Sequence, residues 1–139
     1  MARIAEARCV EHPLGGGPSQ VSRSRQKTGR ALADWGLGDL AELAELVVSE
    51  LVTNAQQHGA GPVHMRLGLG DGVLRVEVHD YGPGRPVRRW PSALDECGRG
   101  LGLLDALISL HGGARGVADD LVGPGKTVYV ELPITNRAA

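Results

Sequence analysis

Apolar residues occupy every second position in two runs of the chain, residues 63–69 and residues 74–78. Successive side chains of a β-strand point to opposite faces, so this alternation is typical of strands with one buried face. A Gly-Asp-Gly turn at residues 70–72 separates the two runs and predicts a hairpin. A third alternating run, residues 126–132, predicts the last strand.

Helical patterns precede and follow this hairpin. Residues 40–57 repeat apolar side chains at three- and four-residue spacing and predict a long helix. Shorter helices are predicted over residues 20–32 and 101–110. Residues 1–11 are a weak strand candidate, and residues 81–100 are irregular and contain several prolines, which is typical of a functional lid.

The predicted elements therefore follow the order strand, helix, helix, hairpin, lid, helix, strand. Their partial segregation indicates an α+β fold, a two-layer α/β sandwich with a mostly antiparallel sheet and helices on one face. The spacing does not fit a doubly wound parallel sheet. The length of 139 residues fits one domain, expected to span residues 1–139 with its core at about residues 20–133.

The composition excludes several classes of function but adds little to the prediction of the fold. Hydrophobic residues make up 42% of the chain, enough for one core, and the net charge is −1. No basic stripe is long enough to follow a phosphate backbone, so nucleic acid is not an expected partner. No apolar run approaches the roughly 20 residues of a membrane span, and the N-terminus has no apolar signal core. Cys9 and Cys97 lack metal-site spacing, and two cysteines are too few for a disulfide scaffold, so we expect reduced thiols and a location in the cytoplasm.

Two polar residues of the long predicted helix, Glu50 and Asn54, do not lie on its solvent-facing side. On a helical wheel of about 100° per residue they lie one turn apart, among Leu43, Leu46 and Val47 at the edge of the apolar face. A carboxylate there costs free energy unless a polar group meets it. Either the pair lines a cavity that holds a ligand or metal, or backbone groups of a neighbouring strand satisfy it. The wheel leaves both interpretations open.

A third polar residue, Asp80, shares the parity of the buried positions in residues 74–78, so it points inward where that strand ends. Gly82 and Gly84 follow it, and glycines let a ligand approach the backbone closely. A carboxylate in an apolar slot is a good acceptor for an exocyclic amine such as adenine N6. An ordinary aspartate turn cap is the competing interpretation.

The segment from Gly98 to Gly102, Gly-Arg-Gly-Leu-Gly, leads into the predicted apolar helix. Backbone N–H groups at a helix N-terminus suit phosphate oxygens, and Arg99 can add a charged donor. A flexible hinge is the alternative. Gly-Lys-Thr at residues 125–127 looks like the end of a P-loop, but Asp120 replaces the earlier glycine and a strand follows, so we reject that interpretation.

Taken in order, these segments resemble the motifs of the GHKL, or Bergerat-fold, ATPases. Residues 50–55 (Glu-Leu-Val-Thr-Asn-Ala) look like the N box, and residues 80–84 (Asp-Tyr-Gly-Pro-Gly) look like the D-x-G-x-G box. Residues 98–103 look like the glycine box that closes the ATP lid, and residues 125–127 match the Gly-Thr-type element before the last strand. The resemblance covers about residues 20–133 and implies the Bergerat, histidine-kinase-like ATPase fold.

The resemblance also implies a role for each matching residue. Asn54 would ligate the Mg²⁺ that bridges the ATP phosphates, and Glu50 would act as general base or orient the attacking hydroxyl or water. Asp80 would accept a hydrogen bond from the adenine amine, and Thr127 would hydrogen-bond near the adenine, beside Asp80. The other matched residues would line the base pocket or contact the phosphates: Gly82, Gly84, Arg99, Gly100, Leu101 and Gly102.

Within this superfamily, residues 47–55 followed by His58-Gly59 are similar to the anti-sigma-factor serine/threonine kinases. That branch binds a sigma factor and phosphorylates an anti-anti-sigma partner of the STAS type, and the resemblance implies a homodimer. Two alternatives share the same pocket: a non-catalytic switch that binds partners according to nucleotide state, and a stand-alone ATPase.

Two features depart from the family pattern. The lid between Gly84 and Gly98 is short and rich in proline, and its Arg88–Pro91 run has no motif interpretation. Nothing in the sequence resembles the phosphoacceptor domain of a sensor kinase, so we do not interpret His58 as a phosphorylation site.

Overall fold

The computed structural model describes residues 8–82, 98–119 and 125–134. Within these residues, five strands form one sheet in the order β1-β2-β3-β5-β4, and every neighbouring pair is antiparallel. None of the described helices combines the length and hydrophobicity needed to cross a membrane. The elements in chain order are β1 (Arg8–Leu14), α1 (Pro18–Asp34), the 3₁₀ turn η1 (Gly38–Leu40), α2 (Ala41–His58), β2 (Val63–Gly70), β3 (Val73–Asp80), α3 (Gly98–Leu110), β4 (Ala114–Asp119) and β5 (Lys126–Pro133).

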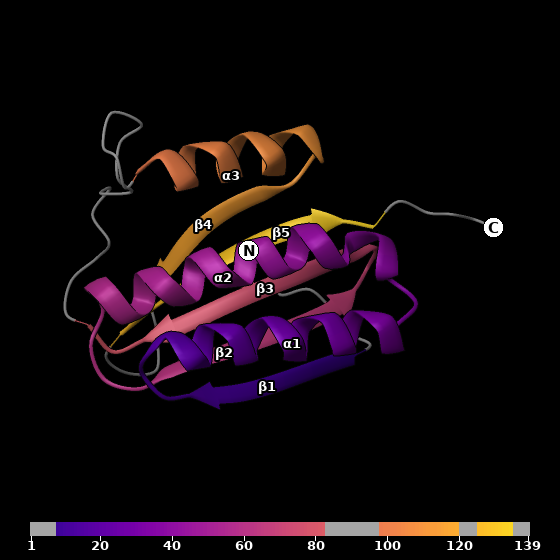
Figure 1. The fold of residues 1–139 in the computed structure, drawn as a ribbon. Helices are drawn as coiled ribbons and strands as arrows, with labels where there is room; N and C mark the ends of the chain where they lie inside the picture. The colour runs from indigo at the N-terminus through magenta and orange to yellow at the C-terminus, as the bar shows by residue number, and fades with distance from the viewer. Residues whose placement is uncertain (1–7, 83–97, 120–124, 135–139) are drawn as a thin grey trace.

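The elements form two layers (Figure 1). Helices α1 and α2 lie alongside each other on one face of the sheet, with α1 near β1 and α2 over β3. Helix α3 follows α2 at the edge of the sheet that ends in β4. The other face carries no helix among the described residues. The predicted α+β sandwich, with an antiparallel sheet and helices on one face, is confirmed.

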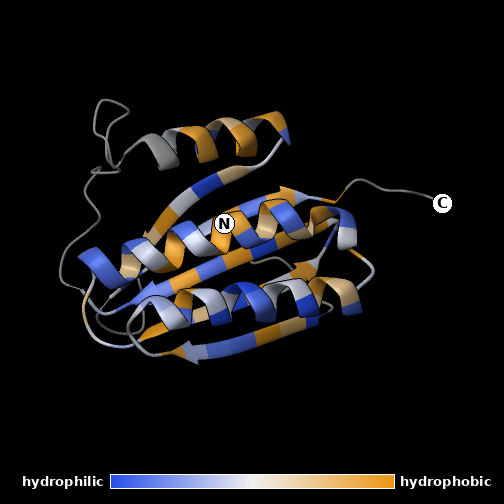
Figure 2. Ribbon diagram, in the orientation of Figure 1, coloured by the Kyte–Doolittle hydropathy of each residue, from blue (hydrophilic) through white to orange (hydrophobic). Residues whose placement is uncertain are grey.

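The core lies between the sheet and the helices. The alternation predicted for β3 is present, because Leu74, Val76 and Val78 are buried in the core whereas Arg75 and Glu77 lie on the opposite face. Figure 2 shows the strands with hydrophobic and hydrophilic segments in alternation. Burying each such side chain stabilises the fold by about 1.5–3 kcal/mol. The buried residues of α2 follow helical spacing: Ala44, Val47, Val48, Leu51, Val52 and Ala55. This packing fixes α2 against β3, which positions the ends of both elements.

The predicted hairpin is also confirmed. Gly70 pairs with Val73, and Asp71 and Gly72 both have positive φ, at 53° and 73°. Two successive residues with positive φ make a type I′ turn, whose twist matches that of the flanking strands. The register of β2 against β3 follows from this turn.

Several boundaries differ from the predictions, and one strand was missed. Strand β4 was not predicted because its sequence, Ala-Arg-Gly-Val-Ala-Asp, has one large apolar residue, Val117, and because it is an edge strand. Helix α3 begins at Gly98 rather than at Leu101, so the glycine-rich segment lies inside the helix. Helix α1 begins at Pro18, since proline fits the first turn of a helix. The first strand extends to Leu14 instead of ending at residue 11.

Candidate functional site

Asp80 ends β3 with its carboxylate inside the protein. As the alternation predicted, it shares the inward face of Val76 and Val78, and it is only 2% exposed. Its Oδ1 atom accepts a hydrogen bond from the backbone N–H of Gly82 at 2.6 Å. Asp80 therefore caps its own turn, as the competing interpretation held. The same bond fixes the orientation of the carboxylate, which leaves Oδ2 as a further acceptor.

Two glycines make room for this carboxylate. A Cβ atom at Gly59 would overlap the carboxyl carbon of Asp80. A Cβ atom at Gly82 would lie 2.9 Å from Oδ1 of Asp80 and 3.1 Å from the Cα atom of Gly59. The N–H of Tyr81 donates to the carbonyl of Ala60 at 2.8 Å, which joins the end of β3 to the segment after α2. Gly59 is thus a site residue that the sequence analysis gave no role.

Lys126, the first residue of β5, is the second site residue that sequence reasoning missed. Its ammonium Nζ donates to Oδ1 of Asp80 at 2.8 Å, and the residue is 8% exposed. Asp80 and Lys126 are paired in the register of β3 with β5. The signal was present in the sequence, because Lys126 has the same parity as Val130 and Leu132, the buried positions of that strand.

Thr127 does not lie beside Asp80, so that expectation is wrong. Strand alternation turns Thr127 to the opposite face of the sheet, where its Oγ1 lies 3.1 Å from Nδ1 of His79. Lys126 takes the place beside Asp80 instead. Whether Thr127 contacts a nucleotide stays a prediction.

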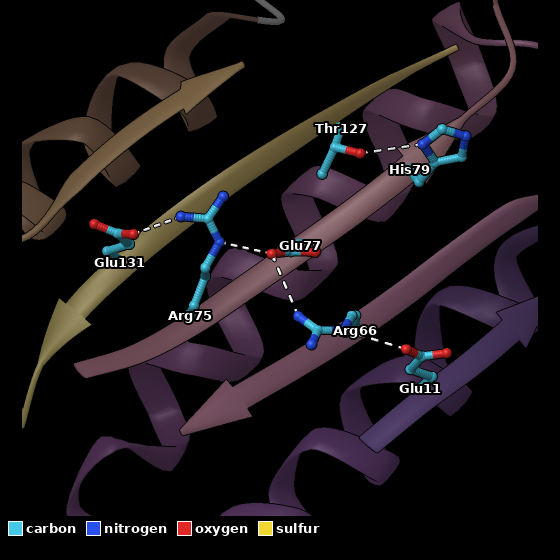
Figure 3. A network of polar contacts seen from close by, with 7 residues as sticks. All are labelled: Glu11, Arg66, Arg75, Glu77, His79, Thr127 and Glu131. Atoms are coloured by element: carbon cyan, nitrogen blue, oxygen red, sulfur yellow. Dashed lines mark hydrogen bonds and ion pairs between the residues drawn. The ribbon is translucent and has the colours of Figure 1, made fainter. Parts of the chain in front are cut away.

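Thr127 and His79 lie to one side of a row of charged residues on the face of the sheet without helices (Figure 3). Arg75 joins Glu131 at 2.5 Å and Glu77 at 2.6 Å, and Arg66 continues the row from Glu77 at 3.5 Å to Glu11 at 3.2 Å. Burial alone would lower the pKa of Arg75, but its hydrogen bonds to Glu77 and Glu131 raise that pKa overall. We call the five charged residues of this row the outer ion row: Glu11, Arg66, Glu77, Arg75 and Glu131.

Glu50 and Asn54 lie on α2 one turn apart, and both are partly exposed. The side-chain Nδ2 of Asn54 is buried and has no hydrogen-bond partner among the described residues. A buried amide without a partner costs free energy, and a ligand or water can remove that cost. A neighbouring strand does not satisfy this atom, which favours the interpretation that Asn54 faces a ligand.

The donor chemistry at Asn54 fits a magnesium ion held together with nucleotide phosphates. A half-turn about the Cβ–Cγ bond exchanges the nitrogen and the oxygen of the amide, so the orphaned position suits a carbonyl oxygen equally. Mg²⁺ prefers oxygen ligands and takes few from the protein, because phosphates and waters supply the rest. No group of three or more His, Cys, Asp or Glu side chains that could hold a metal ion is found among the described residues.

The glycine-rich segment begins α3, and Arg99, Gly100, Leu101 and Gly102 lie in its first two turns. The first N–H groups of a helix have no partner within the helix and suit a phosphate. In Figure 1 this end of α3, the C-terminal end of α2 and the end of β3 lie toward the same side of the molecule. Gly84 and the lid run Arg88–Pro91 lie outside the described residues.

An apolar groove of about 590 Å³ also lies between α2 and α3, away from this site. It contains none of the predicted site residues. Its lining residues are Glu42, Leu43, Leu46, Leu107, Leu110 and His111. This groove therefore does not mark the candidate site, which is instead defined by buried polar groups.

A family model and two curated kinases are similar to this chain. A family model described as a histidine kinase-like ATPase domain matches residues 16–116. The signal transduction histidine-protein kinase AfsQ2 of Streptomyces coelicolor is 29% identical over 101 residues, covering 64% of this chain and 19% of that protein. The sensor protein kinase CarS of Pseudomonas aeruginosa is 32% identical over 117 residues, covering 76% of this chain and 25% of that protein. The chain thus spans a quarter or less of these curated relatives.

Solved structures agree on the fold. The histidine kinase domain of the Erythrobacter litoralis EL346 blue-light activated histidine kinase superposes with a TM-score of 0.56 at 23% identity, over 86% of this chain and 61% of that chain. The Acinetobacter baumannii histidine kinase AdeS superposes with a TM-score of 0.57 at 16% identity, over 93% of this chain and 70% of that chain. The predicted histidine-kinase-like ATPase fold is confirmed.

Proposed function

The chain belongs to the family of histidine kinase-like ATPase domains, in the GHKL superfamily, and is therefore an ATP-binding domain; on that premise we propose that it is an anti-sigma-factor serine/threonine kinase. It binds Mg²⁺ and ATP, sequesters a sigma factor, and phosphorylates an anti-anti-sigma protein of the STAS type. The similarity of residues 47–55 to that branch supports the choice of acceptor.

The observation that carries the proposal is the orphaned amide of Asn54, one helical turn from the carboxylate of Glu50. Asn54 would hold Mg²⁺, which when bound neutralises charge on the phosphates. Asp80 would receive the adenine amine at the other end of the site. The first N–H groups of α3 would donate to the phosphates.

Glu50 would be the general base for phosphoryl transfer. No hydrogen bond or ion pair engages its carboxylate among the described residues, so it is available to accept a proton. A hydroxyl oxygen of the partner forms a bond to the γ-phosphorus, while the bond from that phosphorus to the β–γ bridging oxygen breaks. ADP leaves, and the hydroxyl proton passes to Glu50. A module that only binds nucleotide has no need for this carboxylate.

The test is incubation with γ-labelled ATP and purified candidate anti-anti-sigma proteins. We expect acid-stable label on a serine or threonine of the partner. Glu50→Gln should bind ATP normally and transfer no label, whereas Glu42→Gln, on the exposed side of the same helix, should behave as the parent. Transfer by Glu50→Gln at the parent rate would remove Glu50 from the base role.

The metal assignment has its own variant. Asn54→Ala should abolish Mg²⁺-dependent ATP binding in calorimetry, and Gln57→Ala, an exposed amide on the same helix, is the matched control. Unchanged affinity in Asn54→Ala would contradict the assignment of Mg²⁺ to this residue.

A second candidate function comes from the relatives, of which one is named a signal transduction histidine-protein kinase and the other a sensor protein kinase. The chain would then be the ATP-binding part of such an enzyme and would phosphorylate a histidine. Phosphohistidine loses its label in acid and phosphoserine does not, so the stability of the label separates the two candidates. Hydrolysis of ATP without any protein acceptor would instead indicate a stand-alone ATPase.

A further inference from the structure

Lys126, whose buried ammonium forms an ion pair with Asp80, has no part in the function proposed above. A buried ion pair is a weak source of stability, because the cost of removing both charges from water offsets their attraction, and apolar residues of similar size often do as well. This pair nevertheless lies at the carboxylate that would bind the base. Stability alone therefore does not explain why a lysine ammonium is buried beside this carboxylate.

We propose that Lys126 is a second base-reading residue, whose ammonium donates a hydrogen bond to the ring nitrogen next to the adenine amine. This inference rests on the proposed ATP site and deepens it. Asp80 alone recognises a donor on the base. The pair of Asp80 and Lys126 recognises a donor and the acceptor beside it.

The hydrogen-bonding capacities of both groups leave room for the base. A lysine ammonium has three hydrogens and no acceptor, and the one contact found for this ammonium within the described residues uses a single hydrogen, toward Oδ1 of Asp80. That same oxygen also accepts from the N–H of Gly82. The second carboxylate oxygen keeps its lone pairs for the amine. The pair thus presents an acceptor and a donor side by side, which complements N6 of adenine and its neighbour N1 or N7.

The backbone holds Lys126 in this position. Gly125 precedes it with a φ of +113°, and a Cβ atom at Gly125 would overlap the backbone oxygen of Asp80 and crowd the ring of His79. Strand β5 therefore enters the sheet through a passage that only glycine fits. The next residue, Thr127, points to the opposite face, so of these two residues only Lys126 reaches Asp80.

The first arm of the test uses the unaltered protein and nucleotide analogues. Affinity is measured by calorimetry for ATP, 1-deaza-ATP and 7-deaza-ATP, each with Mg²⁺. Removing the acceptor that Lys126 contacts should weaken binding by about ten- to a hundred-fold, because a hydrogen bond to a charged group contributes that much. Loss with the 1-deaza compound assigns N1, and loss with the 7-deaza compound assigns N7. Equal affinity for all three overturns the inference while leaving the ATP site intact, and absence of ATP binding overturns both.

The second arm ties the effect to the side chain. Lys126→Met should bind ATP about ten- to a hundred-fold more weakly and should no longer distinguish the sensitive analogue from ATP. Lys27→Met, the same change on the outer helix α1, should keep the parent values. Tighter ATP binding by Lys126→Met would show that the ammonium competes with adenine for Asp80, and it would overturn the inference. The analogue series on the unaltered protein decides the question even where Lys126→Met does not fold.

Discussion

Strand β3 carries ion pairs on both of its faces, and the two faces place them in different surroundings. On the face without helices, Glu77 joins the outer ion row, and the side chains of Arg75 and Glu77 are 23% and 20% exposed. On the helix side, Asp80 pairs with Lys126, and their side chains are 3% and 10% exposed. The chemical groups are alike, but the amount of water that reaches them differs.

This difference decides what each interaction can do. Ion pairs that water reaches are screened, and each contributes about 1 kcal/mol or less. A pair removed from water is costly to separate, since the remaining charge is left buried without compensation. The outer ion row is therefore tolerant of change, and the inner pair is not. A charged group that is buried and held in a fixed orientation is also better suited to recognising a ligand.

The largest effect is expected when the inner pair is broken. Lys126→Met should lower the free energy of unfolding by about 3–5 kcal/mol, because it leaves the Asp80 carboxylate buried without its partner. The double variant Asp80→Leu with Lys126→Met should recover most of that loss. Urea denaturation measures both. A loss in Lys126→Met no greater than that of an outer-row variant would erase the contrast between the faces.

The packing around the inner carboxylate predicts the next effect. Gly59→Ala places a Cβ atom against the carboxyl carbon of Asp80 and should cost about 1–3 kcal/mol, as other overpacking changes do. Gly16→Ala is the matched control, because nothing lies within 4 Å of its Cβ position. Thermal unfolding of the two variants gives the comparison. Equal melting temperatures would mean that the site has more room than the contacts indicate.

A smaller effect is expected on the outer ion row. Glu77→Gln removes the carboxylate between Arg66 and Arg75 and should cost about 1 kcal/mol or less at low salt. Raising the salt concentration should shrink that difference, because exposed charges are screened. Denaturation at two ionic strengths tests this. A loss that salt does not reduce would show that the row behaves like the inner pair.

The smallest effect concerns pH. Burial lowers the pKa of His12 below its ordinary value of 6.5, and the nearby charges of Lys27 and Arg23 lower it further. The unfolded chain therefore takes up the proton first, so the stability due to His12 is complete above pH 6.5 and is lost as the pH falls through the lowered value. His12→Gln should weaken the decline in unfolding free energy over this window, as measured by denaturation at a series of pH values. A decline as steep as that of the parent would contradict the assignment to His12.

Local patterns predicted the parts of the fold whose cause is local. The Gly-Asp-Gly turn fixed the hairpin, and the alternation in β3 placed Asp80 on the inward face, because both effects depend on neighbours in the chain. Strand β4 has no such pattern. Its single large apolar residue, Val117, is exposed, so the pairing with β5 rather than burial defines the strand.

The candidate site was harder to predict, since it depends on contacts between distant segments. Lys126 and Asp80 are separated by 46 positions and meet only through the register of β3 with β5. The helical wheel located Asn54 at the edge of the apolar face, but it could not show that its amide lacks a partner. The motif resemblance assigned the place beside Asp80 to Thr127, one residue from the correct one, and in a strand one residue means the opposite face.

The position of β5 also bears on the order in which the chain matures during synthesis. Although β5 follows the other described strands in sequence, it lies inside the sheet between β3 and β4. Until it emerges from the ribosome, both of those strands present open edges of the kind that invite aggregation, and Asp80 has no counter-charge. A chain truncated before Lys126 would keep the N box, the aspartate turn and the glycine segment. It would nevertheless lack the strand that joins β3 to β4 and the lysine that pairs with Asp80, so the proposed site would form only after β5 has been translated.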